Sequence, residues 1–245
     1  MSVVYLVMFN GTGRASDGEI SALRNALATT HGLARALIHV PTQATSSALY
    51  TNVHPTPALA LQIYFSDIGM LEAYCGADGP MRELPSLLPS LASSEITHQA
   101  MLARYFAVPD PVFDTPNGEL PVSNLVTYDG PAEDTNTWLS YYIVTHAPIM
   151  TRLPGLRELE ICMRIDWIDA LPWKRMNVMQ CNKVVFDSVA SLDASHDTPV
   201  MTDLRTDYAL FPPFTGGNSH FAMRTLTITK TDSGKPQHDA SLAVM

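Results

Sequence analysis

The sequence predicts an α+β protein made of two copies of one unit, each about half of the 245-residue chain. Three observations predict this fold class. Short motifs recur in the same order in both halves, β-rich and helical segments alternate in the same order in each half, and a proline-rich segment separates the halves. We therefore expect two similar domains joined by a linker instead of one large domain.

Four short motifs carry the repeat. Residues 63–71 match residues 184–192, where an apolar strand end, two residues of the capping type and an apolar helix start follow one another. Any single match can arise by chance, but four matches in one order and at nearly the same spacing favour a duplication. The other three pairs are residues 97–101 with 219–223, residues 9–11 with 128–130, and residues 31–33 with 154–156.

The first half predicts the order β-α-β-β-α-β. Residues 3–9 are rich in β-branched and aromatic side chains and form the first expected strand. Ser16 and Glu19 have the spacing of a capping box, after which apolar residues recur at helical spacing. The remaining expected elements are strands at residues 33–40 and 58–65, a broken helical stretch at residues 67–91 and a closing strand at residues 97–106.

The second half repeats this order after residues 107–121, which hold four prolines and are typical of a linker. The expected elements are a strand at 122–128, a helix at 135–153, strands at 156–165 and 178–186, an irregular helix to about residue 208 and a strand at 219–228. We assign residues 1–108 to the first repeat, 109–121 to the linker, 122–230 to the second repeat and 231–245 to a flexible polar tail.

A β-α-β-β-α-β order is that of the ferredoxin-like unit, in which helices cover one face of a four-stranded antiparallel sheet. The other face needs a cover, and the second sheet of the same chain can provide it. Polar side chains on the inward faces of two expected strands suggest a ligand-holding space between the sheets, and a salt-bridge network is the alternative. These polar residues are Arg35, His39, Glu158 and Glu160.

The second half also resembles a known family. It contains Trp138, Tyr141, Tyr142, the run His146-Ala147-Pro148, and Arg152 followed by Leu153-Pro154-Gly155-Leu156. These residues resemble the EthD-like family of the dimeric α+β barrel superfamily, in which a helix bearing His-x-Pro and ending near Pro-Gly precedes the second strand. The resemblance covers residues 125–228, whereas the first half shares only the topology. It implies two ferredoxin-like repeats whose antiparallel sheets pack as an α+β barrel, here within one chain.

The composition argues against several classes of function. A net charge of −9 disfavours nucleic-acid binding, and no apolar stretch is long enough to span a membrane. The opening residues lack an export signal, so we expect a cytoplasmic protein. The three cysteines have no metal-ligand spacing, and we predict no metal site. The chain has no complete phosphate-loop pattern and no G-x-S-x-G motif, which argues against nucleotide binding and classical hydrolysis.

Four histidines are candidate catalytic residues, because imidazole exchanges protons near neutral pH. His146 belongs to the His-Ala-Pro run, which has the alternative role of shaping a helix kink and capping backbone carbonyls. His98 and His220 occupy equivalent closing strands, and pseudo-twofold symmetry would present them from opposite halves; a shared packing role is the alternative. His39, on an inward strand face, is the fourth candidate.

Nine further residues are candidates for contact with a substrate. Arg152 is suited to binding a carboxylate or enolate, but an arginine in a last helical turn is also stabilised by the helix dipole. Strand alternation alone places Tyr5, Tyr64 and Asn124 in the cavity. The full set is Arg35, Tyr5, Tyr64, Asn124, Tyr142, Arg152, Glu158, Glu160 and Trp138.

The family resemblance and the histidines together suggest a cofactor-independent catabolic or tailoring enzyme. It would act as an isomerase, lyase or decarboxylase on a small apolar, oxygenated or aromatic compound, by histidine acid/base chemistry in the inter-sheet cavity. One alternative is a non-catalytic ligand-binding or accessory protein of an ether or aromatic degradation pathway, and another is a haem-binding or cofactor-free monooxygenase.

The expected partner is a small-molecule substrate, and we expect no nucleic-acid or membrane partner. The duplicated chain can be a monomer or a homodimer, and the sequence leaves both open. Because only the second half keeps the His-Ala-Pro run, we expect one site, biased to that half and borrowing residues from the first.

Overall fold

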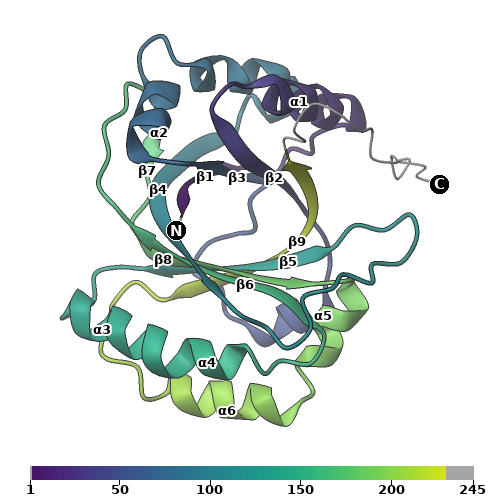
Figure 1. The fold of residues 1–245 in the computed structure, drawn as a ribbon, viewed down its shortest axis with the longest axis vertical. Coiled ribbons are helices and arrows are strands. Elements are labelled where there is room, and N and C mark those ends of the chain that lie inside the picture. Colours follow the sequence, from purple (N-terminus) through teal and green to yellow (C-terminus); the bar gives the residue numbers. More distant parts are fainter. Residues whose placement is uncertain (1, 230–245) are drawn as a thin grey trace.

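The computed structural model describes residues 2–229 and is shown in Figure 1. The predicted tail at residues 231–245 lies outside the described residues. Nine strands follow one another along the chain, and all but the short seventh strand correspond to expected ones. They are β1 (Ser2–Asn10), β2 (Leu33–Pro41), β3 (Leu59–Phe65), β4 (Glu95–Phe106), β5 (Val122–Asp129), β6 (Leu156–Arg164), β7 (Lys174–Arg175), β8 (Val178–Phe186) and β9 (Asn218–Thr229).

Eight of these strands close into an antiparallel barrel, visible as a ring in Figure 1. The order around the barrel is β1-β3-β2-β9-β5-β8-β6-β4, and β4 pairs with β1 to close it. Each half contributes four strands, and the halves join where β2 pairs with β9 and where β4 pairs with β6. The predicted α+β fold, with two ferredoxin-like repeats forming a barrel within one chain, is confirmed. The two sheets meet edge to edge, so backbone hydrogen bonds join the halves in addition to side-chain packing.

Helices cover the outside of the barrel in two layers, one on each half (Figure 1). In the first half, the predicted capping box begins α1, because Ser16 Oγ accepts from the backbone N–H of Glu19 at 3.3 Å. The helices of this half are α1 (Asp17–Thr29), α2 (Ile68–Cys75) and the 3₁₀ turns η1 (Thr45–Leu49), η2 (Pro80–Leu87) and η3 (Pro89–Leu91). Those of the second half are α3 (Thr135–Tyr141), the π turn η4 (Tyr142–His146), α4 (Ala147–Met150), α5 (Val189–Ser195) and α6 (Pro199–Tyr208).

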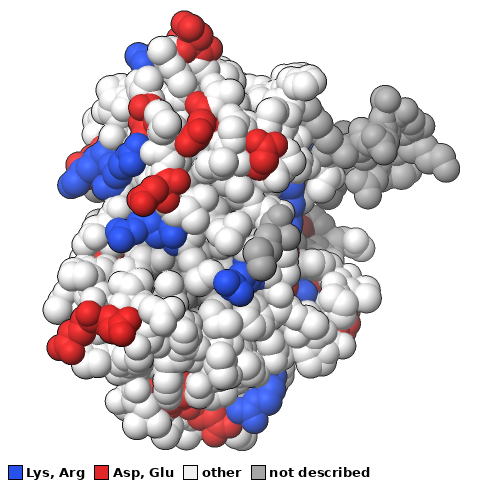
Figure 2. All heavy atoms as spheres, turned by 60° about the vertical axis from the view of Figure 1, so that its left-hand side comes forward, with Lys and Arg blue, Asp and Glu red and all other residues white. Residues whose placement is uncertain are grey.

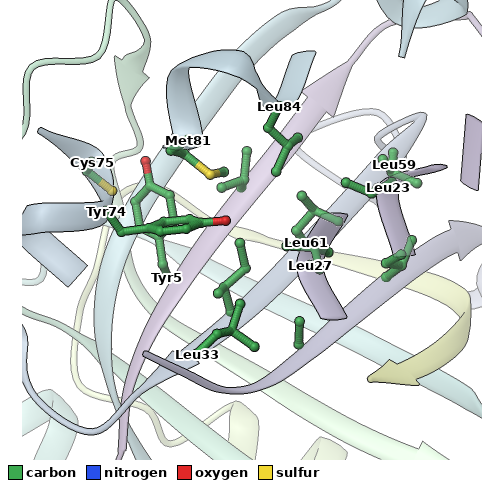
Figure 3. Close-up of a cluster of buried hydrophobic side chains, with 14 of the residues drawn as sticks. Tyr5, Leu23, Leu27, Leu33, Leu59, Leu61, Tyr74, Cys75, Met81 and Leu84 are labelled. Atoms are coloured by element: carbon green, nitrogen blue, oxygen red, sulfur yellow. The ribbon is translucent and has the colours of Figure 1, made fainter. Parts of the chain in front are cut away.

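Side chains fill the space between the sheet and the helices in the first half (Figure 3). Leu23 and Leu27 of α1 pack with Leu59 and Leu61 of β3, and Tyr5 of β1 completes this core. All five side chains are almost fully buried. Burial of this apolar area, at about 25 cal/mol per Å², is the main term that holds the helices on the barrel.

Inside the barrel, a polar network crosses from one half to the other. Arg35 of β2 binds Glu158 of β6 through two hydrogen bonds of 3.1 Å. The fully buried Lys183 of β8 lies 3.1 Å from Glu158 and donates to the Tyr64 hydroxyl at 2.7 Å, and that hydroxyl donates to Glu160 at 2.9 Å. The predicted polar inward faces therefore form a salt-bridge network, as the alternative interpretation had it.

No helix among the described residues has the length and apolar content that crossing a bilayer requires. On the face drawn in Figure 2, lysines and arginines are scattered among acidic residues and form no continuous basic area. This distribution agrees with the acidic composition and gives no support to a nucleic-acid partner on that face.

Candidate active site

A cavity of about 380 Å³ lies in the second half, between the outer face of the sheet and the helices. Its volume falls within the range of small-molecule pockets, roughly 300–1,000 Å³. Aromatic and aliphatic side chains form most of its wall, and histidines, amides and one arginine add polar groups. We take it as the candidate active site.

This location differs from the predicted one, which was between the two sheets. The interior of the barrel also holds a cavity, of about 430 Å³, at Arg35, Glu158 and Lys183. These charged groups already bind one another, so they are satisfied without a ligand. Sequence alternation showed which side chains point inward but not that they would pair with each other.

His146 lies in the wall of the second-half cavity and pairs with a carboxylate of α6. Its Nδ1 is 2.7 Å from Oδ2 of Asp207, and both side chains are buried. Because a carboxylate only accepts hydrogen bonds, Nδ1 carries the proton and Nε2 keeps its lone pair. Within the described residues, Nε2 has no hydrogen-bond partner. Burial lowers the pKa of His146 below its ordinary value, although the hydrogen bond to Asp207 opposes this shift.

The π turn η4 brings Tyr142 and His146 to the same wall of the cavity. It precedes Pro148, which has no backbone N–H to donate to the preceding turn. Single π turns inside helices are frequent at functional sites. The His-Ala-Pro run does interrupt the α-helix as the alternative interpretation suggested, but His146 binds Asp207 and caps no backbone carbonyl.

Tyr142 is fully buried, and its hydroxyl accepts a hydrogen bond from the amide of Asn182 on β8. The Tyr142 hydroxyl also lies 3.6 Å from Sδ of Met150. Trp138 stacks on the Tyr142 ring from behind, with ring centroids 5.3 Å apart, and does not line the cavity. Tyr142 is thus a rigid part of the wall, and Trp138 supports it instead of contacting a ligand.

A second cluster of polar side chains lies at β9 and the end of α5. The imidazole of His220 stacks on the ring of Tyr50, with centroids 3.6 Å apart and an angle of 8° between the planes. The Tyr50 hydroxyl lies 2.7 Å from Nε2 of His196, whose Nδ1 lies 2.9 Å from the carbonyl oxygen of Leu192. A carbonyl only accepts, so Nδ1 of His196 carries the proton and Tyr50 donates to Nε2.

Tyr50 comes from the first half, on the long connection between β2 and β3, which reaches the second half. Asn52 holds this connection against β9: its amide donates to the carbonyl of His220 at 3.0 Å and accepts from the N–H of His220 at 2.8 Å. The backbone N–H of His54 donates to Ser219 Oγ at 2.9 Å. The cavity therefore contains residues from both halves, with most of its wall in the second.

His98 and His220 are not brought together, contrary to the predicted pairing. Each lies on the outer face of its own half, beneath that half's helices. His98 binds the Tyr5 hydroxyl at 2.5 Å and contacts Trp167 and Trp173, which come from the connection between β6 and β8. These two tryptophans help fill the first-half space that corresponds to the cavity. Tyr5 therefore faces the helices and does not line the inter-sheet space.

The other predicted residues divide between three places. Asn124 of β5 lines the second-half cavity, not the barrel interior. His39 lies inside the barrel, where it binds Gln62 at 3.2 Å and Thr225 at 3.0 Å. Arg152 is half exposed and pairs with Asp203 at 2.8 Å, away from the cavity. Inside the barrel, with His39, lie Arg35, Tyr64, Glu158 and Glu160.

Four residues of the site were not found from the sequence. Tyr50, Asn182, His196 and Asp207 belong to no motif, and they approach the cavity from separate elements. Asp207 is 61 positions from His146, and Tyr50 is 146 positions from His196. Periodicity describes neighbours along one element, so it carries no signal for such pairs.

The described residues contain no group of three or more histidine, cysteine or acidic side chains placed to hold a metal ion. All three cysteines are free and buried. The polar groups that line the cavity are imidazoles, amides, hydroxyls and the guanidinium of Arg205.

No protein-family model and no curated protein matches the chain. Solved structures do match it. An anthrone oxidase-like protein has a TM-score of 0.63 at 11% identity and covers 97% of both chains. A candidate monooxygenase from Fusobacterium nucleatum has a TM-score of 0.58 at 9% identity and covers 94% of both chains. An ethyl tert-butyl ether degradation (EthD) family protein from Bacillus halodurans matches 41% of this chain and 97% of its own, with 22% identity and a TM-score of 0.32.

The first two of these structures share the overall fold of this chain over nearly its whole length. At such low identity they establish the fold and not the reaction. This chain has the dimeric α+β barrel fold, with both halves of the barrel in one polypeptide.

Proposed function

We propose that the chain is a cofactor-independent enzyme that moves protons in a small aromatic or otherwise apolar, oxygenated compound, as an isomerase, lyase or decarboxylase. The observation that carries this proposal is the buried His146–Asp207 pair in the wall of the second-half cavity. A histidine oriented by a carboxylate is a common arrangement for acid/base catalysis. We place the chemistry in this cavity and not inside the barrel.

The proposed reaction begins with Nε2 of His146 removing a proton from a carbon that is conjugated with a substrate carbonyl, either directly or, as in anthrone, through an aromatic ring. The electron pair moves onto the carbonyl oxygen, and an enolate and an imidazolium form. Asp207 stabilises the imidazolium through the hydrogen bond to Nδ1. His146 then returns the proton to the same or another carbon, which gives exchange or isomerisation. The lowered pKa of His146 keeps the imidazole in the basic form at neutral pH.

The negative charge on the enolate oxygen needs hydrogen-bond donors. Asn124 of β5 lines the cavity, and its side chain makes no hydrogen bond within the described residues. Its amide is therefore available to a ligand, unlike that of Asn182, which donates to Tyr142. The aromatic wall formed by Tyr128, Tyr142 and Phe186 suits a flat substrate.

Proton exchange in anthrone tests this proposal. Anthrone is a flat aromatic ketone with an acidic CH₂ group, and the name of one structural neighbour points to this compound. We expect the protein to accelerate exchange of these protons in deuterated buffer, measured by NMR, and His146→Gln to slow it by about 10²- to 10⁴-fold. Arg152→Gln, at an exposed ion pair outside the cavity, is the matched control and keeps the wild-type rate. An unchanged rate in His146→Gln would exclude the histidine mechanism.

The two alternative functions give different results in the same samples. A monooxygenase would consume oxygen and convert anthrone to anthraquinone, and a haem enzyme would show a Soret band as purified. A non-catalytic binding protein would bind anthrone in wild type and His146→Gln alike without accelerating exchange. The apolar cavity wall supports binding in all of these cases, so the exchange rate distinguishes them.

A further inference from the structure

His220 lines the cavity, and one nitrogen of its ring is buried without a hydrogen-bond partner among the described residues. Its Nδ1 is buried and has no hydrogen-bond partner, and the ring makes no side-chain hydrogen bond to any described residue. The imidazole ring stacks on the ring of Tyr50. A buried ring nitrogen without a partner costs free energy, and no residue of the described part of the chain is bonded to the other ring nitrogen, Nε2. Because the ring lines the cavity, Nε2 is the nitrogen that a ligand could reach.

Arg205, in the last turn of α6, is a second polar group at this cavity, and it is exposed to solvent. It lines the same cavity, and within the described residues no carboxylate pairs with it. Its charge acts on the neighbouring Tyr50, where it opposes the rise in the Tyr50 pKa that burial causes. The helix dipole favours an arginine at a helix end, and here the guanidinium also lies in the wall of the cavity, without an ion pair to hold it elsewhere among the described residues.

The lining of the cavity contains no aspartate and no glutamate among the described residues. Asp207 is close by, but its two carboxylate oxygens accept from His146 and from the Tyr141 hydroxyl, at 2.7 and 2.8 Å. Arg205 is therefore the permanently charged side chain in this lining, although the whole chain carries a net charge of −9. A guanidinium in the wall of a cavity attracts an anionic group of a ligand.

We infer that the ligand of this cavity is an aromatic carboxylate, with its anionic group held by Arg205 and His220 and its ring on the apolar wall toward His146. Guanidinium pairs with carboxylate through parallel hydrogen bonds, and the ring N–H of His220 can supply another donor. The inference rests on the proposed function, because it names the substrate class of that same site. It also assigns Tyr50 the role of positioning His220 by stacking on it.

The test compares 2-naphthoate with 2-naphthamide, which has nearly the same shape and no charge. We expect isothermal titration to show about tenfold tighter binding of the carboxylate to the wild-type protein, with a difference that shrinks at high salt. Arg205→Gln should weaken naphthoate to the level of the amide and leave the amide unchanged. Arg205 is exposed, so the variant should fold, which circular dichroism checks.

Two controls separate this inference from the proposed mechanism. Arg152→Gln removes an exposed arginine elsewhere on the helices and should keep the preference for naphthoate. His146→Gln should abolish proton exchange and also keep the preference, so loss of catalysis and loss of anion binding are distinguishable. Equal affinities of the two ligands in wild type, no binding of either, or an equal loss of both in Arg205→Gln would each overturn the inference.

Discussion

His146 and His220 face one cavity but differ in how their ring nitrogens are bonded. His146 has one nitrogen fixed by Asp207, which leaves the other with a lone pair, whereas neither nitrogen of His220 has a hydrogen-bond partner within residues 2–229. The first arrangement suits proton transfer and the second suits ligand binding. Two histidines in one cavity can thus have different roles, which their identical chemistry in the sequence does not reveal.

The Asp207→Asn variant tests whether Asp207 controls the tautomer and the pKa of His146. The amide of asparagine can donate to Nδ1 of His146 and so place the imidazole proton on Nε2, the nitrogen that should act as the base. The amide also carries no charge that would stabilise the imidazolium. We therefore expect the plateau rate of anthrone exchange to fall by about 10²- to 10⁴-fold. Asp207 also raises the pKa of His146 against the effect of burial. Its removal should therefore move the acidic limb of the rate profile to lower pH. A variant with the wild-type plateau and limb would show that Asp207 does not act on His146.

His39, inside the barrel, makes stability depend on pH. Burial, followed by the charge of Lys183, lowers its pKa to about 3. Between pH 6.5 and about 3 the unfolded chain binds a proton at this position and the folded chain does not, so the free energy of unfolding falls as the pH falls, by about 1.4 kcal/mol per pH unit. Urea denaturation at pH 6 and pH 5 should show a loss about 1 kcal/mol smaller in His39→Gln than in wild type. Equal losses would contradict this account.

At the scale of elements, the π turn η4 sets the direction of His146. One residue beyond the α-helical number turns the following side chains by about 100°. Deletion of Val144, which is 74% exposed, should restore regular α-helix and carry His146 away from Asp207. We expect loss of anthrone exchange in a protein that still folds, measured by NMR exchange and circular dichroism. Val144→Ala keeps the π turn and should keep the wild-type rate.

The strands show which part of the fold could be predicted. In β2, only one face is uniformly apolar, so alternation correctly assigned Arg35 and His39 to the barrel interior. In β1, both faces are apolar, and alternation could not decide which of them meets the helices. Tyr5 was therefore placed on the wrong side. The order of elements predicted the barrel. Each four-stranded sheet has one face without helices, and the other sheet of the same chain can cover that face.

The site was predicted less well, because its residues meet only after the whole chain has folded. His146 was identified from a local motif, and one site in the second half with contributions from the first was also expected. That assignment stays a prediction until activity is measured. Tyr50 reaches His220 through a connection that has no periodic pattern and no motif, so sequence analysis had no means to place it.

At the scale of the whole molecule, Lys183 connects the two halves electrostatically. It is fully buried and lies between Glu158 and Glu160, within 3.1 and 3.5 Å. Lys183→Met leaves the fully buried Glu160 without this cation and the partly buried Glu158 with Arg35 alone, and we expect a loss of about 3–5 kcal/mol in the free energy of unfolding. Arg152→Ala, at an exposed pair, should change it by less than about 1 kcal/mol. A loss in Lys183→Met as small as that of the control would show that the network contributes little.

The two halves differ in the space between their sheet and helices: side chains pack it in the first half, and a cavity lies there in the second. This difference predicts the stoichiometry of ligand binding. A barrel assembled from two identical chains presents two equal sites, and occupation of one can alter the other. In this chain, Trp167 and Trp173 pack against His98 in the core of the first half, whereas the equivalent His220 of the second half lines the cavity. Titration with naphthoate should therefore saturate at one ligand per chain along a hyperbolic curve, without homotropic cooperativity.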